Sequence, residues 1–227
     1  MLYEPIAVGS LELKNRLVMP PMQTDRSSLG HVTDDMVQYY ADRARYSNPG
    51  LLISEHCFIT EQGRADANQL SFTDDSCVEE HRRITDAVHA AGSRMIIQLN
   101  HAGNAAEPLH GEALVSASDV CSLRKPGTPA PRPLRESEIY GLEQEFALAA
   151  KRALAAGYDG VEIHSAHGYL LNQFYSPLTN RRTDAYGPGC MENRLRFLLE
   201  TVAAVRSAVG SEVPLAVRLG GADYMEG

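Results

Sequence analysis

Short apolar runs alternate with helical patterns along this chain, and this alternation restricts the fold more than any other feature. The runs are rich in aliphatic and β-branched residues, and they occupy residues 17–19, 51–53, 95–99, 160–163 and 215–219. Between them lie amphipathic helical patterns at residues 33–46, 74–91, 137–156 and 191–209. Buried strands that alternate with helices predict a parallel sheet covered by helices. The pattern leaves open whether that sheet is doubly wound or closed into a barrel.

The ends of the helical patterns carry recognisable signals. Thr33 and Ser137 each precede acidic residues, as expected of capping residues at helix N-termini. Gly92 and Gly157 follow helical segments, where a residue that tolerates positive φ ends a helix. We therefore expect helices to begin and end close to these four positions.

Two segments do not fit the alternation. Residues 2–13 alternate apolar and polar residues around Gly9 and Ser10, which predicts a small hairpin over one end of the sheet. Residues 100–134 contain many glycines and prolines and no clear periodicity. A segment of this length is long for a plain connection, so we expect an active-site lid or excursion.

Composition excludes several classes of protein. The 227 residues include 21 Lys and Arg against 29 Asp and Glu, a net charge of −8, and no basic run that could follow a phosphate backbone. We therefore expect no nucleic-acid partner. No apolar stretch reaches membrane-spanning length, which favours a soluble, cytoplasmic protein with no membrane partner. The four cysteines lack any CxxC pair and are expected to be reduced thiols.

The most informative segment is residues 161–172, which begins as a strand and turns at its carboxyl end, where functional groups gather in parallel α/β folds. It places His164, His167 and Tyr169 within six residues. Two imidazoles and a phenol can hold a substrate oxygen and deliver a proton. We therefore take these three residues as candidate catalytic groups.

Other interpretations of the same residues remain open at this point. The His164/His167 pair could bind a metal, although no third His or carboxylate follows at helical spacing. Both imidazoles could instead be satisfied structural groups in the core. Tyr169 taken alone is more often a packing residue. Spacing by itself does not decide among these roles.

Longer motifs show a family resemblance. The runs EIHSAHGYLLNQF at 162–174, SPLTNRRTDAYG at 176–187 and ENR at 192–194 closely resemble the bacterial Old Yellow Enzyme and NADH:flavin oxidoreductase family. Supporting motifs are spread over the rest of the chain: NRLVMPPM at 15–22, QLNHAG at 98–103 and VRL at 217–219. Three places depart from the family: Asn104 follows Gly103 where Arg is usual, Pro188 to Cys190 replace the usual Gly and Ser, and Gly220 and Gly221 stand where Ser is common.

The resemblance implies that residues 1–227 form one FMN-binding domain, a (β/α)₈ TIM barrel of which about the first five strands are present. A barrel of this kind takes eight strands and roughly 250 residues. The domain is thus expected to be incomplete at its C-terminus, where the flavin-phosphate loops would follow. The expected partners are a complementary chain that completes the barrel or further copies of the chain in a homo-oligomer.

The resemblance also implies roles for single residues. The loop after the first strand would lie against the flavin, with Gln23 or Thr24 near its reactive edge. Gln98 would bind the pyrimidine side of the ring, and Arg218 would lie near N1 and O2, where a cation favours the reduced anion. The full set of candidate FMN contacts is Pro20, Pro21, Met22, Gln23, His56, Gln98 and Arg218. Taken singly, Gln98 and Arg218 could be structural residues and Pro20-Pro21 a rigid turn.

The implied reaction passes a hydride from NADH or NADPH through FMN to the activated C=C bond of an unsaturated carbonyl, nitro or enoyl-type small molecule. His164 and His167 would hold the activating oxygen, and Tyr169 would protonate the α-carbon. No metal is expected. Two alternatives come from other classes: a non-catalytic or flavin-free partial barrel serving as a subunit or fragment of a larger flavoenzyme, and a metal hydrolase.

Overall fold

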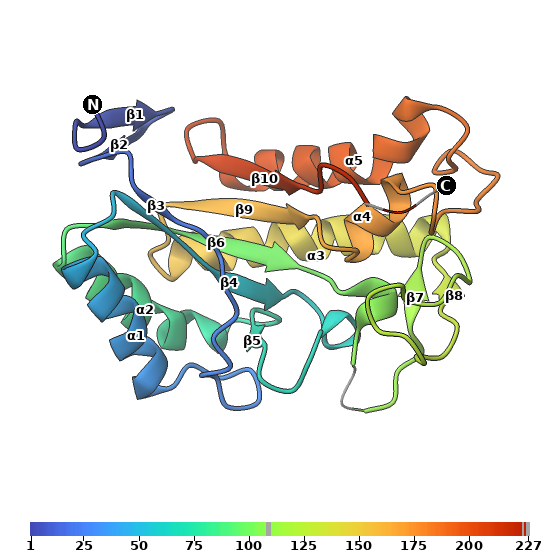
Figure 1. The fold of residues 1–227 in the computed structure, drawn as a ribbon, viewed down its shortest axis with the longest axis horizontal. Helices are drawn as coiled ribbons and strands as arrows, with labels where there is room; N and C mark the ends of the chain where they lie inside the picture. Colours follow the sequence, from blue (N-terminus) through green and yellow to red (C-terminus); the bar gives the residue numbers. More distant parts are fainter. Residues whose placement is uncertain (108–109, 224, 226–227) are drawn as a thin grey trace.

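The computed structural model describes residues 1–107, 110–223 and 225, and a six-stranded parallel sheet forms its centre (Figure 1). The strands are β3 (Val18–Met19), β4 (Leu51–Phe58), β5 (Leu70–Ser71), β6 (Arg94–Asn100), β9 (Gly160–Ser165) and β10 (Leu215–Leu219). Along the main path the order is β3-β4-β6-β9-β10, and β5 pairs with β4 at the side. Spatial order therefore follows chain order.

Four long helices connect these strands: α1 (Asp34–Tyr46), α2 (Cys77–Ala90), α3 (Glu136–Ala155) and α5 (Met191–Val209). Neighbouring helices pack in the same order as the strands, α1 on α2, α2 on α3 and α3 on α5. A doubly wound sheet would reverse its strand order at a switch point. Because the described strands show no reversal, the architecture is that of a partial (β/α)₈ barrel, and the doubly wound alternative is wrong.

The predicted helix signals are confirmed at three of four positions. Thr33 caps α1 by accepting a hydrogen bond from the amide of Met36 at 3.2 Å. Gly92 and Gly157 follow α2 and α3 with φ of 75° and 88°. The prediction that Ser137 begins α3 is wrong.

The helix α3 instead starts at Glu136, after Arg135 as the capping residue. The backbone amide of Arg135 donates to the carboxylate of Glu138 at 2.8 Å, so an acidic side chain in the first turn supplies the cap.

The segments 2–13 and 100–134 form a hairpin and an excursion, as predicted. Strands β1 (Ile6–Val8) and β2 (Leu11–Leu13) form the expected antiparallel hairpin, and Figure 1 shows it at the end of the sheet opposite α4 (Leu170–Tyr175). Between β6 and α3 the chain makes an excursion with one short parallel ladder, β7 (Val115–Ser116) with β8 (Arg132–Pro133). Residues 108–109 of the excursion lie outside the described residues.

The strands alternate between an apolar outer face and a polar inner face. On β9, Val161 and Ile163 belong to the apolar core beneath the helices, whereas Glu162 and His164 are buried polar residues on the other face. This alternation follows from the two-residue period of a strand. It gives the barrel interior a polar wall in which a site can form.

The predicted strand 51–53 is too short, since β4 continues to Phe58 through the buried polar residues Ser54, Glu55 and His56. Its pairing with β6 shifts within this stretch: Ile53 lies opposite Ile96, but His56 lies opposite Gln98. One extra residue is therefore inserted in β4, as in a β-bulge. Without the extra residue, Glu55 rather than His56 would lie opposite Gln98.

Glu55 is fully buried and ties the loop after β3 to the sheet. Its Oε2 accepts hydrogen bonds from Thr24 Oγ1 at 2.6 Å and from the hydroxyl of Tyr40, on α1, at 3.3 Å. The same hydroxyl accepts from the Glu55 amide at 2.8 Å, while Glu55 Oε1 has no partner among the described residues. Burial raises the pKa of Glu55 to about 7 despite these hydrogen bonds.

This raised pKa makes stability depend on pH. The folded protein binds a proton at Glu55 more tightly than the unfolded chain, so the stabilisation is fully present below the unfolded pKa of about 4.3 and is lost as pH rises through about 7. Glu55→Gln keeps a neutral group of the same shape. Through Glu55, the unfolding free energy of the parent protein should fall by about 3 kcal/mol between pH 4 and pH 8. The variant should not show this fall, as measured by urea denaturation at each pH.

Asp119→Asn is the matched control, because it removes a carboxylate that is exposed. It should retain the pH dependence of the parent protein. Equal pH profiles for Glu55→Gln and the parent would contradict the assignment of this dependence to Glu55.

Candidate functional site

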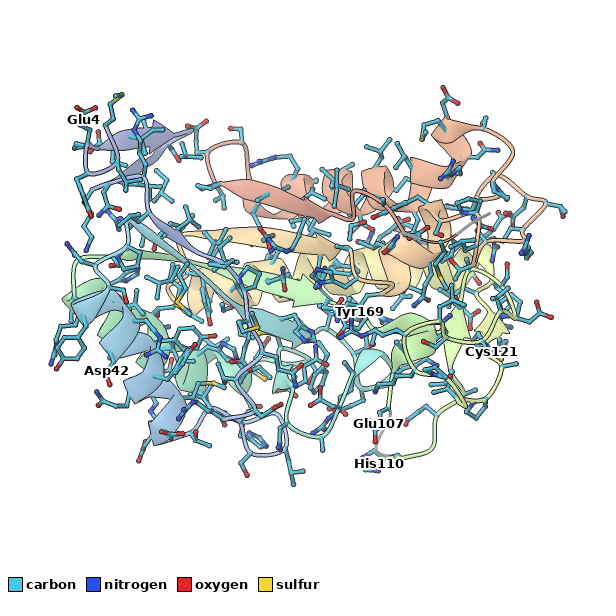
Figure 2. The ribbon with its side chains drawn as sticks, in the orientation of Figure 1. Glu4, Asp42, Glu107, His110, Cys121 and Tyr169 are labelled. Carbon is cyan, nitrogen blue, oxygen red and sulfur yellow. The ribbon has the colours of Figure 1, made fainter. Side chains whose placement is uncertain are left out.

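A cavity of about 330 Å³ lies at the carboxyl ends of the strands. It is lined by Pro20, Pro21, Met22, Gln23, His56, Gln98, Arg124, His164, His167, Tyr169 and Arg218. The structure therefore brings together all ten residues nominated from the sequence and adds Arg124. Figure 2 shows Tyr169 where the sheet strands end.

Strand register aligns the cavity residues of four neighbouring strands. His56 on β4 lies opposite Gln98 on β6, and Gln98 lies opposite Glu162 on β9. Two residues beyond Glu162 on β9, on the same face of the strand, His164 lies opposite Arg218 on β10. Rigid strands, rather than loops, thus set the spacing of these side chains.

Glu162 extends this set, although it was not nominated from the sequence. Its Oε1 accepts a hydrogen bond of 2.6 Å from the side-chain amide of Gln98. Burial raises the pKa of Glu162, while this hydrogen bond and the charge of Arg218 oppose the rise. The polar positions 162 and 164 alternate with apolar 161 and 163, and this pattern could have identified Glu162 from the sequence.

His56 is fixed by hydrogen bonds on both ring nitrogens. The amides of Gln69 and Asn100 lie 2.8 and 3.1 Å from Nδ1, and the Oε1 of Gln23 lies 2.9 Å from Nε2. The Gln23 amide in turn donates to Asp66 at 2.7 Å, which directs its oxygen toward the imidazole. This arrangement fits a neutral His56 that carries its proton on Nε2.

The three candidate catalytic residues form one aromatic cluster. The Tyr169 ring lies edge-on to the His164 ring, with centroids 5.1 Å apart, and tilted against the His56 ring at 5.4 Å. The His167 Nδ1 lies 3.3 Å from His164 Nε2. His167 has a φ of 59°, a backbone conformation that costs energy for a non-glycine residue and clusters at functional sites.

Both imidazoles of this pair favour the neutral form. Burial is the main cause that lowers the pKa of His164 well below its usual value, and neighbouring imidazoles and guanidinium groups add to it. Burial and the charges of Arg218 and Arg124 lower the pKa of His167. The amide of Ala166 donates to His164 Nδ1 at 3.3 Å, so a neutral His164 carries its proton on Nε2.

The loops after β6 and β9 are held together by Gln173, on α4. Its side-chain amide donates to the carbonyl of Gly168 at 2.7 Å and to Asn104 Oδ1 at 2.8 Å, and its side-chain oxygen accepts from the backbone N–H of Asn104 at 3.1 Å. A Cβ on Gly103 would lie 2.2 Å from that oxygen, so the loop needs glycine there. Asn104, one of the departures from the family pattern, is therefore an integral part of this network.

Arg124 is the cavity residue that the sequence did not reveal. It lies on the excursion between β6 and α3, with its guanidinium carbon 4.7 Å from the centre of the Tyr169 ring. Its Nη1 donates to the backbone oxygen of His167 at 3.4 Å. Because residues 100–134 lack periodicity, no sequence signal indicates which of their side chains reaches the site.

Across residues 1–107, 110–223 and 225, no group of three or more His, Cys, Asp or Glu is arranged to hold a metal ion. Within that part of the chain, no helix is both long and apolar enough to cross a membrane. The four cysteines are free, with Cys57 and Cys77 buried.

The hydrogen bonds of His56 give a direct prediction. Burial lowers its pKa to about 4, whereas a free imidazole titrates near 6.5. Nitrogen-15 NMR of the ring should therefore show a neutral His56 with its proton on Nε2 at pH 5.5. The stability this group contributes is present above pH 6.5 and is lost as pH falls through about 4. A His56 that protonates above pH 6 would contradict this arrangement.

Comparison with known proteins identifies relatives over the whole chain. A profile of the NADH:flavin oxidoreductase / NADH oxidase family matches residues 1–227. A metal reductase of Desulforamulus reducens is 43% identical over 228 residues, which are 100% of this chain and 33% of that protein. A chanoclavine-I aldehyde reductase of Penicillium roqueforti is 44% identical over 218 residues, covering 93% of this chain and 58% of that protein. The chain thus spans about a third to three fifths of these relatives.

Solved structures agree with these sequence relatives. Morphinone reductase superposes with a TM-score of 0.89 at 34% identity, covering 96% of this chain and 61% of that chain. An Old Yellow Enzyme homologue from Zymomonas mobilis gives 0.88 at 37% identity, covering 96% and 62%. The resemblance found in the sequence motifs is confirmed. The chain belongs to the NADH:flavin oxidoreductase / NADH oxidase family, that of Old Yellow Enzyme, whose cofactors are FMN and a nicotinamide.

Proposed function

We propose that the protein transfers a hydride from NADH or NADPH, through FMN, to the activated C=C bond of an unsaturated carbonyl, nitro or enoyl-type compound. The observation that carries this proposal is the meeting of His164, His167 and Tyr169 in one cavity with Gln98 and Arg218. The names of the relatives point to different electrophiles, a metal, an aldehyde and morphinone. The choice of an alkene therefore rests on the oxygen-binding and proton-donating groups of this chain.

The cavity residues fit a flavin ring. Arg218 is half-buried and makes no hydrogen bond or ion pair within the described part of the chain. A half-buried cation without an anionic partner is suited to a ligand that carries or develops negative charge. Gln98 adds an amide, and Pro20, Pro21 and Met22 add an apolar wall. An apolar surface with a few convergent polar groups matches a flat heterocycle with carbonyl and ring-nitrogen acceptors.

When bound, FMN would supply the hydride that reaches the β-carbon of the double bond. His164 and His167 would hold the activating oxygen through ring N–H groups and stabilise the charge that develops there. Neutral imidazoles suit this role, because their lowered pKa values keep them as fixed donors without releasing a proton at neutral pH. The long 3.3 Å contact between the two rings leaves the His164 proton available to a better acceptor.

Tyr169 would provide the proton for the α-carbon. Burial raises the pKa of its hydroxyl, with Arg124 opposing the rise, so the phenol stays protonated at neutral pH. A proton donor must be in its protonated form and close to the reacting atom. Tyr169 meets the first condition, and its ring lies beside His164, which supports the second for a substrate oxygen held by the two imidazoles.

The flavin assignment can be tested without measuring turnover. Arg218→Gln should weaken FMN binding, measured by quenching of flavin fluorescence, and lower the midpoint potential of the bound flavin by roughly 30 mV, the equivalent of about 1.4 kcal/mol for two electrons. The control is Arg45→Gln, which removes an exposed cation from α1. FMN binding that is absent in the parent protein would favour the flavin-free alternative.

The assignment of Tyr169 as the proton donor predicts different effects on flavin reduction and on flavin reoxidation. Tyr169→Phe should leave flavin reduction by NADH or NADPH within about twofold and slow reoxidation by an unsaturated ketone by about 10²-fold or more, since general acid catalysis commonly contributes this much. Anaerobic stopped-flow absorbance follows each step. Equal losses in both half-reactions would rule out Tyr169 as the proton donor.

A further inference from the structure

The position of Arg124 gives it access to more than the catalytic cavity. A second cavity, of about 460 Å³, is lined by residues that include Leu123, Asn172, Leu219 and Gly220. It shares two residues with the catalytic cavity, Arg124 and His167. Arg124 therefore lies at the boundary between the space beside Tyr169 and a neighbouring space large enough for a further part of a ligand.

Arg124 is exposed, and no carboxylate among the described residues forms an ion pair with its guanidinium. It donates to the backbone oxygen of His167 at 3.4 Å, and it lies beside the Tyr169 phenol, whose pKa rise it opposes. Its neighbour Lys125 differs, because that ammonium group pairs with Glu107 at 3.2 Å and donates to a backbone oxygen. Two adjacent cations on the same excursion are thus in different states, one paired and one not.

No group that lines the catalytic cavity forms an ion pair with Arg124. The nearest titratable groups in the catalytic cavity are His164, His167 and Tyr169, which favour their neutral forms, and Arg218, a second cation. The catalytic cavity has no carboxylate in its lining.

Two carboxylates lie nearby, and both already accept hydrogen bonds. Asp66 accepts from Gln23 at 2.7 Å, and Asp223, in the second cavity, accepts from Ser176 at 2.5 Å. Neither carboxylate forms an ion pair with Arg124 within the described residues, so its guanidinium N–H donors are available to an anionic ligand group.

We infer that Arg124 is a binding subsite for the carboxylate of a substrate whose activated double bond lies beside Tyr169. The planar guanidinium presents paired N–H donors that match a carboxylate. Its contact with the Tyr169 ring places it next to the residue proposed to protonate the substrate. The position of the double bond in this inference rests on the proposed function. Binding of an anionic ligand group by Arg124 does not depend on that function.

The test uses two ligands that differ in one charge, 6-oxoheptanoate and its methyl ester. They are the saturated products expected from 6-oxohept-4-enoate and its ester after addition of one hydride and one proton. Calorimetric titration of the flavin-loaded protein measures their binding without turnover. Arg124→Gln should weaken binding of the carboxylate about tenfold or more and leave the ester within about twofold, since a hydrogen bond to a charged group is commonly worth this factor.

Lys125→Gln is the matched control. It removes the adjacent cation, which lines neither cavity, and should leave both ligands unchanged. Arg124→Lys keeps the charge without the paired donors and should restore part of the affinity. Raising the salt concentration should weaken binding of the carboxylate to the parent protein more than to Arg124→Gln. An equal carboxylate-to-ester ratio in the parent and in Arg124→Gln overturns the inference.

A phosphate of the nicotinamide is another possible source of the same negative charge. Flavin reduction by NADH, which has phosphates, is compared with reduction by dihydronicotinamide riboside, which has none. A selective loss with NADH in Arg124→Gln, without loss of carboxylate binding, would overturn the assignment to the substrate. If the parent binds 6-oxoheptanoate through Arg124 but does not reduce 6-oxohept-4-enoate, the proposed reaction fails and the anion subsite stands.

Discussion

The residue register of the parallel sheet is the constraint on which the site depends. Because side chains alternate between the two faces of a strand, a shift of one residue exchanges core and cavity positions. The extra residue in β4 causes such a shift in the stretch between Ile53 and His56. It turns His56 toward Gln98 and leaves Glu55 to bind Tyr40 beneath the sheet. A single irregularity thus places an imidazole, rather than a second carboxylate besides Glu162, opposite Gln98.

That exchange has an electrostatic consequence for the whole cavity. A carboxylate in the place of His56 would pair with a nearby guanidinium and raise the pKa values of the imidazoles. With His56 neutral, the cavity contains cations and neutral donors and has no carboxylate in its lining. Such an environment stabilises negative charge on a ligand, which is what both a reduced flavin and a developing enolate require. The neutrality of the histidines is therefore part of how the site would work.

The sequence predicted what depends on local pattern and missed what depends on irregular backbone. Alternating apolar runs gave the order of strands and helices, and the motif around His164 identified the family. The length of β4 could not be predicted, because polar residues fill its second half and burial there comes from tertiary contacts. Arg124 could not be predicted either, since its approach to Tyr169 depends on the path of an aperiodic excursion. Neither the length of β4 nor the position of Arg124 produces a periodic pattern in the sequence from which it could be predicted.

This difference in predictability separates two parts of the site. The groups proposed to bind flavin and activate oxygen lie on strands or directly after them, and a network around Gln173 fixes the loop that carries His167. Arg124 reaches the same cavity from the aperiodic stretch between β7 and β8, which pair with each other. Substitutions in this segment can change which ligand is held without moving the strand residues. The same barrel can therefore keep one chemistry while the excursion changes what it acts on.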